Sequence, residues 1–315
     1  MSKALRIAYG EALAELGARN GNVVVLDADL AHATMTYLFK DAYPGRFYNF
    51  GIAESNMMCA AAGMAHSGLV PFASTFAIFG AGRAYEQVRN AIAYTNANVK
   101  IACTHPGISV GEDGGSHQSI EDIALMREIP GMTVLVPGDC IETKKAVFAA
   151  AEMDGPVYLR ISRQPSPDVT KPDTPFAAGG SVVLRRGWDV CIMAVGLMLP
   201  LALEAAQQLA GEGIGAEVVS MYSIKPIDRD YILDANRRFG GIVTAEEHSV
   251  IGGLGSAVAE VIAGQSGARF ARVGVEDRFG RSGKPEQLFE AYGLTAGHIA
   301  QKCRETLGRV SQQYK

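Results

Sequence analysis

The sequence predicts an α/β protein built from two consecutive open, mostly parallel three-layer α/β domains. Its length of 315 residues suits about two domains, each with its own core. Short apolar runs alternate with helix-length segments, which is the pattern of parallel strands joined by crossover helices. A segment with four prolines and a Gly pair, residues 163–181, separates two such series. We therefore predict a first domain at 1–167, a linker at 168–182 and a second domain at 183–315.

The first series contains six strand-like runs. Those at 22–30, 98–105 and 132–139 are almost continuously apolar, as strands covered on both faces tend to be. The predicted strands are 22–30, 46–51, 69–76, 98–105, 132–139 and 156–162. The predicted helices are 4–19, 54–67, 80–95, 119–128 and 140–153.

The second series repeats this alternation after the linker. Its predicted strands are 189–195, 216–221, 241–246 and 269–275. Its predicted helices are 199–212, 228–239, 253–264 and 285–292. The two series together indicate two layered domains rather than an array of repeats.

The composition argues against several classes of partner. The net charge is −4 and no long run of Lys or Arg occurs, so we expect neither nucleic acid nor a membrane as partner. The longest apolar run, near residues 57–65, is too short to cross a bilayer, and the amphipathic N-terminus is not of signal-peptide type. The five cysteines are widely spread, as expected for reduced thiols in a cytoplasmic protein.

The short ligand-binding motifs that the sequence resembles are incomplete. GRSGKPE (280–286) resembles the end of a phosphate-binding P-loop, but Pro285 stands where Ser or Thr is required. GGLGS (252–256) lacks the full dinucleotide fingerprint and predicts a tight strand-to-helix turn. Asp27 and Asp29 could be metal ligands, but could equally position a ligand at the end of a strand.

Polar side chains gather where the predicted strands of the first domain end. In an open α/β sheet, ligands bind in the crevice outside these carboxyl ends. The segment THPGISVGEDGGSHQS (104–119), rich in glycine and serine, suits a loop folded against a ligand. The candidate residues in this crevice are Asp29, Glu54, His105, Asp113, His117 and Arg163.

Each candidate also has a purely structural interpretation. Glu54 could only favour the N-terminus of a helix, and Arg163 could be a solvated loop charge. The two histidines could be hydrogen-bonded structural residues, and Phe76 and Phe79 could belong to the core. The shared position of the candidates at one edge of the sheet is what favours a functional site.

The order of several motifs resembles the pyrimidine-binding domain of transketolase, a thiamine-diphosphate enzyme. These motifs are DADL, FGIAESN, STFAIFGAGRAYEQVRN, THPGISVGEDGGSHQS, LVPGD and YLRISRQ. VVSMYSIKPID and TAEEHSVIGGLGSAVAEVI resemble its C-terminal domain, so the resemblance covers nearly the whole chain. It implies transfer of a two-carbon ketol unit from a ketose or its phosphate to an aldose or its phosphate.

The resemblance implies that Glu54 is catalytic and contacts the cofactor. Its carboxyl group would reach the aminopyrimidine ring and promote the imino tautomer, whose nitrogen removes the thiazolium C2 proton. Apolar surroundings would favour the protonated carboxyl group. Phe76 and Phe79 match the aromatic pair on the pyrimidine ring, Asp29 matches an acid near the cofactor, and Arg83 is a further predicted cofactor contact.

The resemblance also implies the substrate contacts. Asp113 and His117 match residues that contact the ketose hydroxyls and reacting oxygens, and His117 is the second predicted catalytic residue. His105 and Arg163 match groups that hold the terminal phosphate, for which a guanidinium is well suited.

Two positions depart from the family pattern. Ala33 stands where a phosphate-binding serine is common, so that either Thr34 substitutes or the acceptor carries its phosphate differently. Gly82, followed by Arg83, replaces a bulky residue and loosens the predicted pyrimidine pocket.

The GDG…Asn motif, which holds the diphosphate through Mg²⁺ in this family, is absent. The resemblance is therefore to a C-terminal subunit of a split transketolase. It implies an N-terminal partner subunit that carries this motif and binds the Mg²⁺, with thiamine diphosphate shared between the subunits of an α2β2 assembly. We expect no metal site on this chain and no activity from it alone. Residues 78–90 and 246–255 are the predicted contact surfaces.

Other functions stay open. The chain could be the β-type subunit of a 2-oxoacid dehydrogenase or of a deoxyxylulose-phosphate synthase-like enzyme. It could be a ketol transferase for an unusual sugar, or a non-enzymatic remnant. GISVGEDGGSHQ and SRQ favour transketolase.

Overall fold

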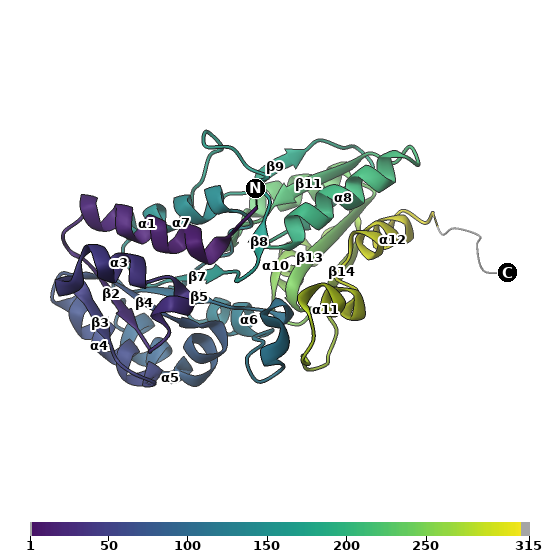
Figure 1. Cartoon of the computed structure of the whole chain (residues 1–315). Coiled ribbons are helices and arrows are strands. Elements are labelled where there is room, and N and C mark those ends of the chain that lie inside the picture. Colours follow the sequence, from purple (N-terminus) through teal and green to yellow (C-terminus); the bar gives the residue numbers. More distant parts are fainter. Residues whose placement is uncertain (1, 310–315) are drawn as a thin grey trace.

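The computed structural model describes residues 2–309. Two α/β units lie side by side, an N-terminal unit in purple to teal and a C-terminal unit in green to yellow (Figure 1). Each unit has a central sheet with helices on both faces. This confirms the predicted fold class.

The larger sheet, of seven strands within residues 2–309, has the order β12-β6-β7-β5-β4-β2-β3. All neighbours are parallel except β12, which pairs antiparallel with β6. The strands are β2 (Val23–Asp27), β3 (Phe47–Asn49), β4 (Val70–Phe76), β5 (Lys100–Thr104), β6 (Thr133–Leu135), β7 (Val157–Ile161) and β12 (Ser223–Lys225). The carboxyl ends of the parallel strands meet at one edge.

Helices cover both faces of this sheet. One face packs against α1 and α7 through residues such as Leu13 and Val147, and the other packs against α4 and the helical segments of 78–93. The helical elements are α1 (Leu5–Arg19), α2 (Ala31–Thr34), α3 (Tyr37–Ala42), η1 (Pro44–Arg46), α4 (Glu54–His66), η2 (Ile78–Arg83), α5 (Tyr85–Gln87), η3 (Val88–Ala93), η4 (Ile108–Asp113), α6 (Asp122–Glu128) and α7 (Cys140–Glu152). Asp139 caps α7 by accepting from the Glu142 amide at 2.7 Å.

The second sheet, of five strands in the described chain, has the order β14-β13-β10-β11-β9, and only β9 is antiparallel to its neighbour. One face packs against α8, α11 and α12, and the other against α9 and α10. The elements are β9 (Val182–Arg185), β10 (Val190–Ala194), α8 (Met198–Ala210), β11 (Ala216–Ser220), α9 (Arg229–Arg238), β13 (Gly241–Ser249), α10 (Leu254–Ile262), β14 (Arg269–Val275), α11 (Pro285–Tyr292) and α12 (Ala296–Thr306).

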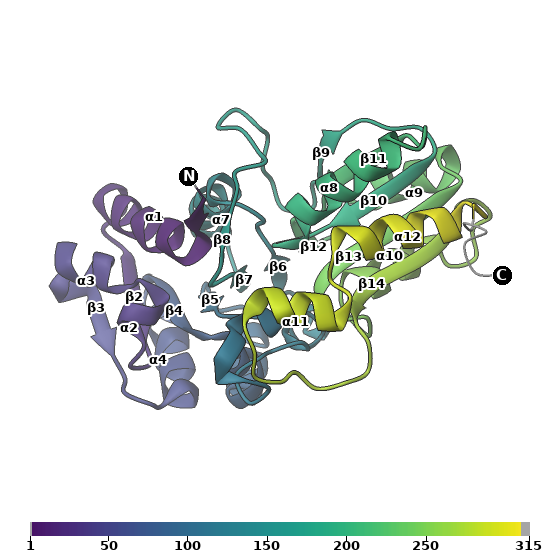
Figure 2. The ribbon, with the colours of Figure 1, turned by 45° about the vertical axis from the view of Figure 1, so that its right-hand side comes forward.

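The two units share a core. One apolar cluster runs from Val24 and Ile101 in the first unit through Ile224 to Ile232 and Val258 in the second. Figure 2 shows α11 lying across the junction, beside the first unit. A two-stranded pair, β1 (Lys3–Ala4) with β8 (Pro165–Ser166), brings the start of α1 to the end of β7.

All ten predicted strands are present, and each predicted helix has a counterpart. The helix predicted at 80–95 is instead the irregular series η2, α5 and η3, with π-type turns of the kind often found near functional sites. The prediction missed the short antiparallel edge strands β9 and β12, the β1–β8 pair, and the helices α2, α3 and α12. The predicted domain boundaries stay a prediction. The strand β12 follows the predicted linker in the sequence, yet it belongs to the sheet of the first unit.

No helix among residues 2–309 is both long and apolar enough to cross a membrane. All five cysteines are free thiols.

Candidate active site

Glu54 begins α4 at the carboxyl edge of the first sheet, and its side chain is only 2% exposed. Arg83 Nη1 donates to both carboxylate oxygens, at 3.0 and 2.9 Å. The Arg83 guanidinium also lies 4.3 Å from the centre of the Phe79 ring. The prediction that Glu54 has only apolar surroundings was therefore incomplete, because a guanidinium holds the carboxylate.

An aromatic group adjoins this pair. The rings of Phe76 and Phe79 are 6.0 Å apart and nearly parallel, at 12°. Phe76 stacks on the His105 imidazole at 4.0 Å, and Phe79 meets the edge of His117 at 5.5 Å. Phe76 ends β4, and His105 directly follows the neighbouring strand β5, so the sheet itself places them together. Together with the Glu54–Arg83 pair, the structure thus joins six predicted residues through direct contacts.

A cationic group lies beside His105. Burial, together with the guanidinium groups of Arg6 and Arg163, lowers the pKa of His105 to about 3, so that its imidazole is neutral at physiological pH. Its Nδ1 lies 2.8 Å from Thr104 Oγ1. Arg6 Nη1 donates to the Ala33 carbonyl at 2.8 Å, while its buried Nε has no hydrogen-bond partner in the structure. Two guanidinium groups whose charges act on a neutral imidazole suit the binding of an anion.

Arg6 was not among the predicted site residues. It lies on α1, remote in sequence from the loops of the site, and the β1–β8 pair brings it there. No local motif marks this position. Only the three-dimensional pairing of the chain start with residues after β7 reveals it.

Asp113 lies at the exposed side of this group. Its carboxylate is 3.6 Å from Arg163 Nη1, and that nitrogen also donates to the Val110 carbonyl at 2.7 Å. His117 Nδ1 lies 3.0 Å from the Ser116 hydroxyl. Asp113 and His117 therefore flank the cationic group and the aromatic group respectively.

Asp29 lies at the same edge, at the exposed end of β2. Its carboxylate accepts a hydrogen bond from Asn49 at 3.3 Å. The hydrogen bonds of Asp29 do not join it to the other predicted site residues. Asp27 is instead buried, accepts from Thr34 Oγ1 and Thr36 Oγ1, and has a raised pKa because of burial. Its role is structural. The suggestion that Thr34 replaces the missing serine at Ala33 was wrong, because the Thr34 hydroxyl is buried and bound to Asp27.

Comparisons with known proteins agree with this arrangement. Residues 1–168 match the family model of the transketolase pyrimidine binding domain, and residues 179–299 match that of the transketolase C-terminal domain. The chain belongs to the transketolase family. It corresponds to the C-terminal part of the transketolase polypeptide, as predicted.

Among relatives, the putative transketolase C-terminal section of Methanocaldococcus jannaschii is 47% identical over 97% of this chain and 96% of its own. A 6-deoxy-6-sulfo-D-fructose transketolase subunit of a Clostridium species is 42% identical over 97% of this chain and 95% of its own. A solved split-gene transketolase, described as an inactive beta4 tetramer, is 51% identical, covers 98% of this chain and 99% of its own, and superposes with a TM-score of 0.90.

Membership of the transketolase family implies thiamine diphosphate as cofactor. The residues present suit its aminopyrimidine end. Each Glu54 oxygen that accepts from Arg83 can accept a second hydrogen bond, and Phe76 and Phe79 supply aromatic faces beside it. Among residues 2–309, no group of three or more His, Cys, Asp or Glu side chains could hold a metal ion.

The prediction that residues 246–255 of this transketolase chain contact a partner subunit was partly wrong. In the segment 246–255, Glu246, Glu247 and His248 are buried, and they serve contacts within the chain. His248 Nε2 accepts from the Ala124 amide of the first unit at 3.3 Å. The other surface, 78–90, carries exposed side chains and stays a prediction.

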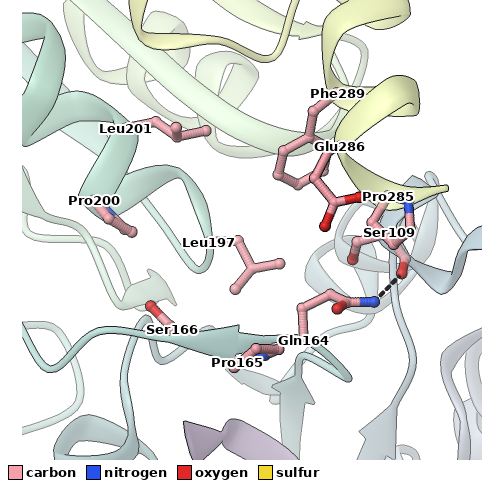
Figure 3. Close-up of a pocket in the computed structure, with 10 residues that line it drawn as sticks. All are labelled: Ser109, Gln164, Pro165, Ser166, Leu197, Pro200, Leu201, Pro285, Glu286 and Phe289. Carbon is pink, nitrogen blue, oxygen red and sulfur yellow. Dashed lines mark hydrogen bonds between the residues drawn. The ribbon is translucent and has the colours of Figure 1, made fainter. Parts of the chain in front are cut away.

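A pocket lies at the junction of the two units, behind the segment 104–119. Figure 3 shows Leu197, Pro200 and Leu201 of the second unit on one side and α11 on the other. Gln164 donates to the Ser109 carbonyl at 2.7 Å beside it (Figure 3). This pocket does not include Glu54 or the aromatic group.

Proposed function

We propose that this chain is the C-terminal subunit of a split transketolase that moves a two-carbon ketol unit between sugars or sugar phosphates. The observation that carries the proposal is the single connected group at the sheet edge. Contacts lead there from a buried carboxylate through a pair of stacked aromatic rings to His105, whose pKa the charges of Arg6 and Arg163 help to lower. These are the three kinds of site that a heteroaromatic cofactor and an anionic sugar require.

When bound, thiamine diphosphate supplies the nucleophilic carbon that carries the ketol unit. Glu54 shares a proton with the ring nitrogen of the aminopyrimidine, and Arg83 keeps the carboxylate in place from the side. Phe76 and Phe79 orient the ring by stacking.

The substrate end is bound by the other residues. Arg6 and Arg163 hold the phosphate, and the neutral His105 imidazole hydrogen-bonds beside them. His117 and Asp113 contact the sugar hydroxyls, with His117 next to the aromatic ring of Phe79. Asp29 lines the outer end of the same edge.

The diphosphate and its Mg²⁺ are bound by an N-terminal partner subunit with the GDG…Asn motif, and two copies of each chain form α2β2. Support comes from the similarity to a relative described as a transketolase C-terminal section, which this chain covers over 96% of its length. The solved split-gene relative is an inactive tetramer of beta subunits, and we expect the same of this chain alone. We also predict a cytoplasmic location, because thiols are kept reduced in that compartment.

A second candidate is transfer from a sugar whose terminal anion is a sulfonate. A relative is described as a 6-deoxy-6-sulfo-D-fructose transketolase subunit, and Ala33 removes the hydroxyl that the family commonly uses on phosphate. Competition between fructose 6-phosphate and 6-deoxy-6-sulfofructose in the reconstituted enzyme distinguishes the two. A higher kcat/KM for the sulfonate would make it the substrate.

The primary test begins with capture of the tagged chain from its own cells and identification of the co-purifying subunit. The complex is then assayed for ketol transfer with E54Q and with E11Q, an exposed control on α1. We expect E54Q to assemble and bind the partner but to lose at least about a hundredfold in kcat, while E11Q keeps full activity. Full turnover by an assembled E54Q enzyme would contradict the assignment.

The same preparation tests the other thiamine-diphosphate enzymes. Pyruvate as donor would indicate deoxyxylulose-phosphate synthase-like chemistry, and oxidation of 2-oxoacids would indicate a dehydrogenase subunit. Purification without any partner, and without turnover, would support a non-enzymatic protein.

A further inference from the structure

The segment Thr104–Ser119, called the substrate loop below, is held both by its own hydrogen bonds and by contacts from the C-terminal unit. Its glycines Gly107, Gly111 and Gly114 have φ of +75°, +87° and +75°, which are left-handed conformations available in an unfolded loop as well. Besides the short helical turns of η4, the Gly107 amide donates to the Ser119 carbonyl at 2.7 Å, and Gln118 Nε2 donates to the Ile108 and Gly111 carbonyls at 3.1 Å. None of these internal bonds uses the Ser109 amide, so the position of this part of the loop also depends on what packs against it.

Glu247 of the C-terminal unit provides such a contact. Its Oε1 accepts from the Ser109 amide at 2.6 Å, and the residue is 3% exposed. A Cβ added at Gly107 would lie 2.4 Å from the Glu247 carboxyl carbon. The carboxyl group thus lies directly against the backbone of the substrate loop, and glycine at 107 makes this approach possible.

Glu247 is itself fixed to the first unit. Arg160 Nη2 donates to the Glu247 carbonyl at 2.9 Å, and the same guanidinium pairs with Asp122 at 2.8 and 3.1 Å. Because Asp122 takes the direct ion pair, the Glu247 carboxyl group remains an acceptor for the loop amide. Burial raises the pKa of Glu247 to about 7, although the nearby charge of Arg160 acts in the opposite direction.

The contact continues toward the candidate site. The Ser109 carbonyl accepts from Gln164 Nε2 at 2.7 Å, and the next carbonyl, that of Val110, accepts from Arg163 Nη1 at 2.7 Å. Arg163 in turn lies 3.6 Å from Asp113. Displacing the Ser109 backbone would therefore move the acceptor that orients Arg163.

We infer that Glu247 is a positioning residue: it fixes the backbone of the substrate loop, so that a side chain of the C-terminal unit shapes a site on the first unit. The link to catalysis depends on the proposed function, whereas the link to the loop does not. The neighbouring Glu246 offers a matched control. It is equally buried in β13, but its oxygens accept from the Leu254 and Gly255 amides of α10 within its own unit.

Hydrogen exchange of the full chain, followed by mass spectrometry, tests the loop directly. In E247A we expect amides of the substrate loop to exchange about tenfold faster, because a hydrogen bond to a carboxyl group and its packing are lost. E247Q keeps an oxygen acceptor of the same shape and should stay within about twofold of the wild type. E246A should accelerate exchange in α10 and leave the loop unchanged. Unchanged loop exchange in E247A, or equal acceleration in E246A, would overturn the inference.

Kinetics of the reconstituted complex then test the consequence. We expect E247A to raise KM for a phosphorylated donor about tenfold with a smaller change in kcat, and E247Q to restore it. If E247A does not fold, G107A tests the same contact, because its Cβ collides with the carboxyl group; faster loop exchange supports the inference and unchanged exchange overturns it. Faster loop exchange without any ketol transfer in the wild type would reject the proposed function while keeping the role of Glu247 in the loop.

Discussion

Arg83 binds Glu54 through one nitrogen, Nη1, which lies within 3.0 Å of both carboxylate oxygens. The guanidinium is half exposed, while the carboxylate is buried. An isolated carboxylate would be costly at such a position, so the cation makes a buried acid at the start of α4 tolerable. Stacking on Phe79 limits the directions from which the guanidinium can approach.

The coupling between Arg83 and Glu54 can be measured in a double-mutant cycle. We expect R83Q to lower the free energy of unfolding by about 1 kcal/mol, since the exposed side of the pair is screened by water. E54Q/R83Q should be no less stable than R83Q, because the carboxylate that lost its partner is gone. Urea unfolding of the four chains gives the coupling energy; additive effects of the two changes would mean that the pair is not coupled.

Arg6 should bind the anion of the substrate. Replacing it by glutamine removes a charge-assisted hydrogen bond, so we expect KM for a phosphorylated donor to rise about tenfold or more, with little effect on an unphosphorylated one. R19Q is the matched control, because Arg19 lies on the same helix but pairs with Glu15. The measurement is KM for both donors in the reconstituted enzyme. An equal rise with both donors would argue against phosphate binding by Arg6.

The depressed pKa of His105 predicts a specific pH dependence. Its pKa falls to about 3 in the folded chain, against about 6.5 when unfolded. As the pH is lowered, His105 therefore binds a proton in the unfolded chain before it does so in the folded chain. The stability that this residue contributes is complete above pH 6.5 and is lost as the pH falls toward 3. NMR of histidine-labelled protein should show no titration of the His105 signal between pH 5 and 8, whereas the urea-unfolded chain titrates near 6.5. H105N identifies the signal. A midpoint above 6 in the folded chain would contradict burial as its dominant environment.

Glu247 should give the opposite dependence. Its folded pKa of about 7 exceeds the unfolded value of about 4.5, so the folded chain retains its proton to higher pH. The stability that this gives is complete below pH 4.5 and is lost as the pH rises through 7. The wild type should therefore lose more stability than E247Q between pH 6 and 8. Urea midpoints at the two pH values measure this difference, and equal losses would show that Glu247 does not titrate there.

The strands were predictable because buried parallel strands leave a strong local mark. Val23–Asp27 and Lys100–Thr104 are buried along their whole length, and their sequences are correspondingly apolar. β9 and β12 were missed because a short edge strand is stabilised by pairing with distant residues rather than by its own pattern. The break of 80–95 into three segments depends in the same way on packing.

The candidate site was predictable in part for a related reason. Residues at the ends of parallel strands meet at one edge, so the contact of Phe76 with His105 follows from the topology. Arg6 was not predictable, because its place depends on the pairing of the chain start with residues after β7. The contact of Glu247 with Ser109 likewise results from the packing of two units, which no local pattern encodes.

β12 gives the chain a property that its two-part appearance conceals. Ser223 and Lys225 pair with β6 of the other unit, and Lys225 Nζ donates to the carbonyls of Arg127 and Ile129 at 2.8 and 2.6 Å. Separating the two units would remove β12 from the seven-stranded sheet and leave the backbone of β6 exposed without its partner. A hinge between the halves is therefore not an available way to admit a sugar. A protease that nicks the connecting segment should leave two fragments that still migrate as one particle.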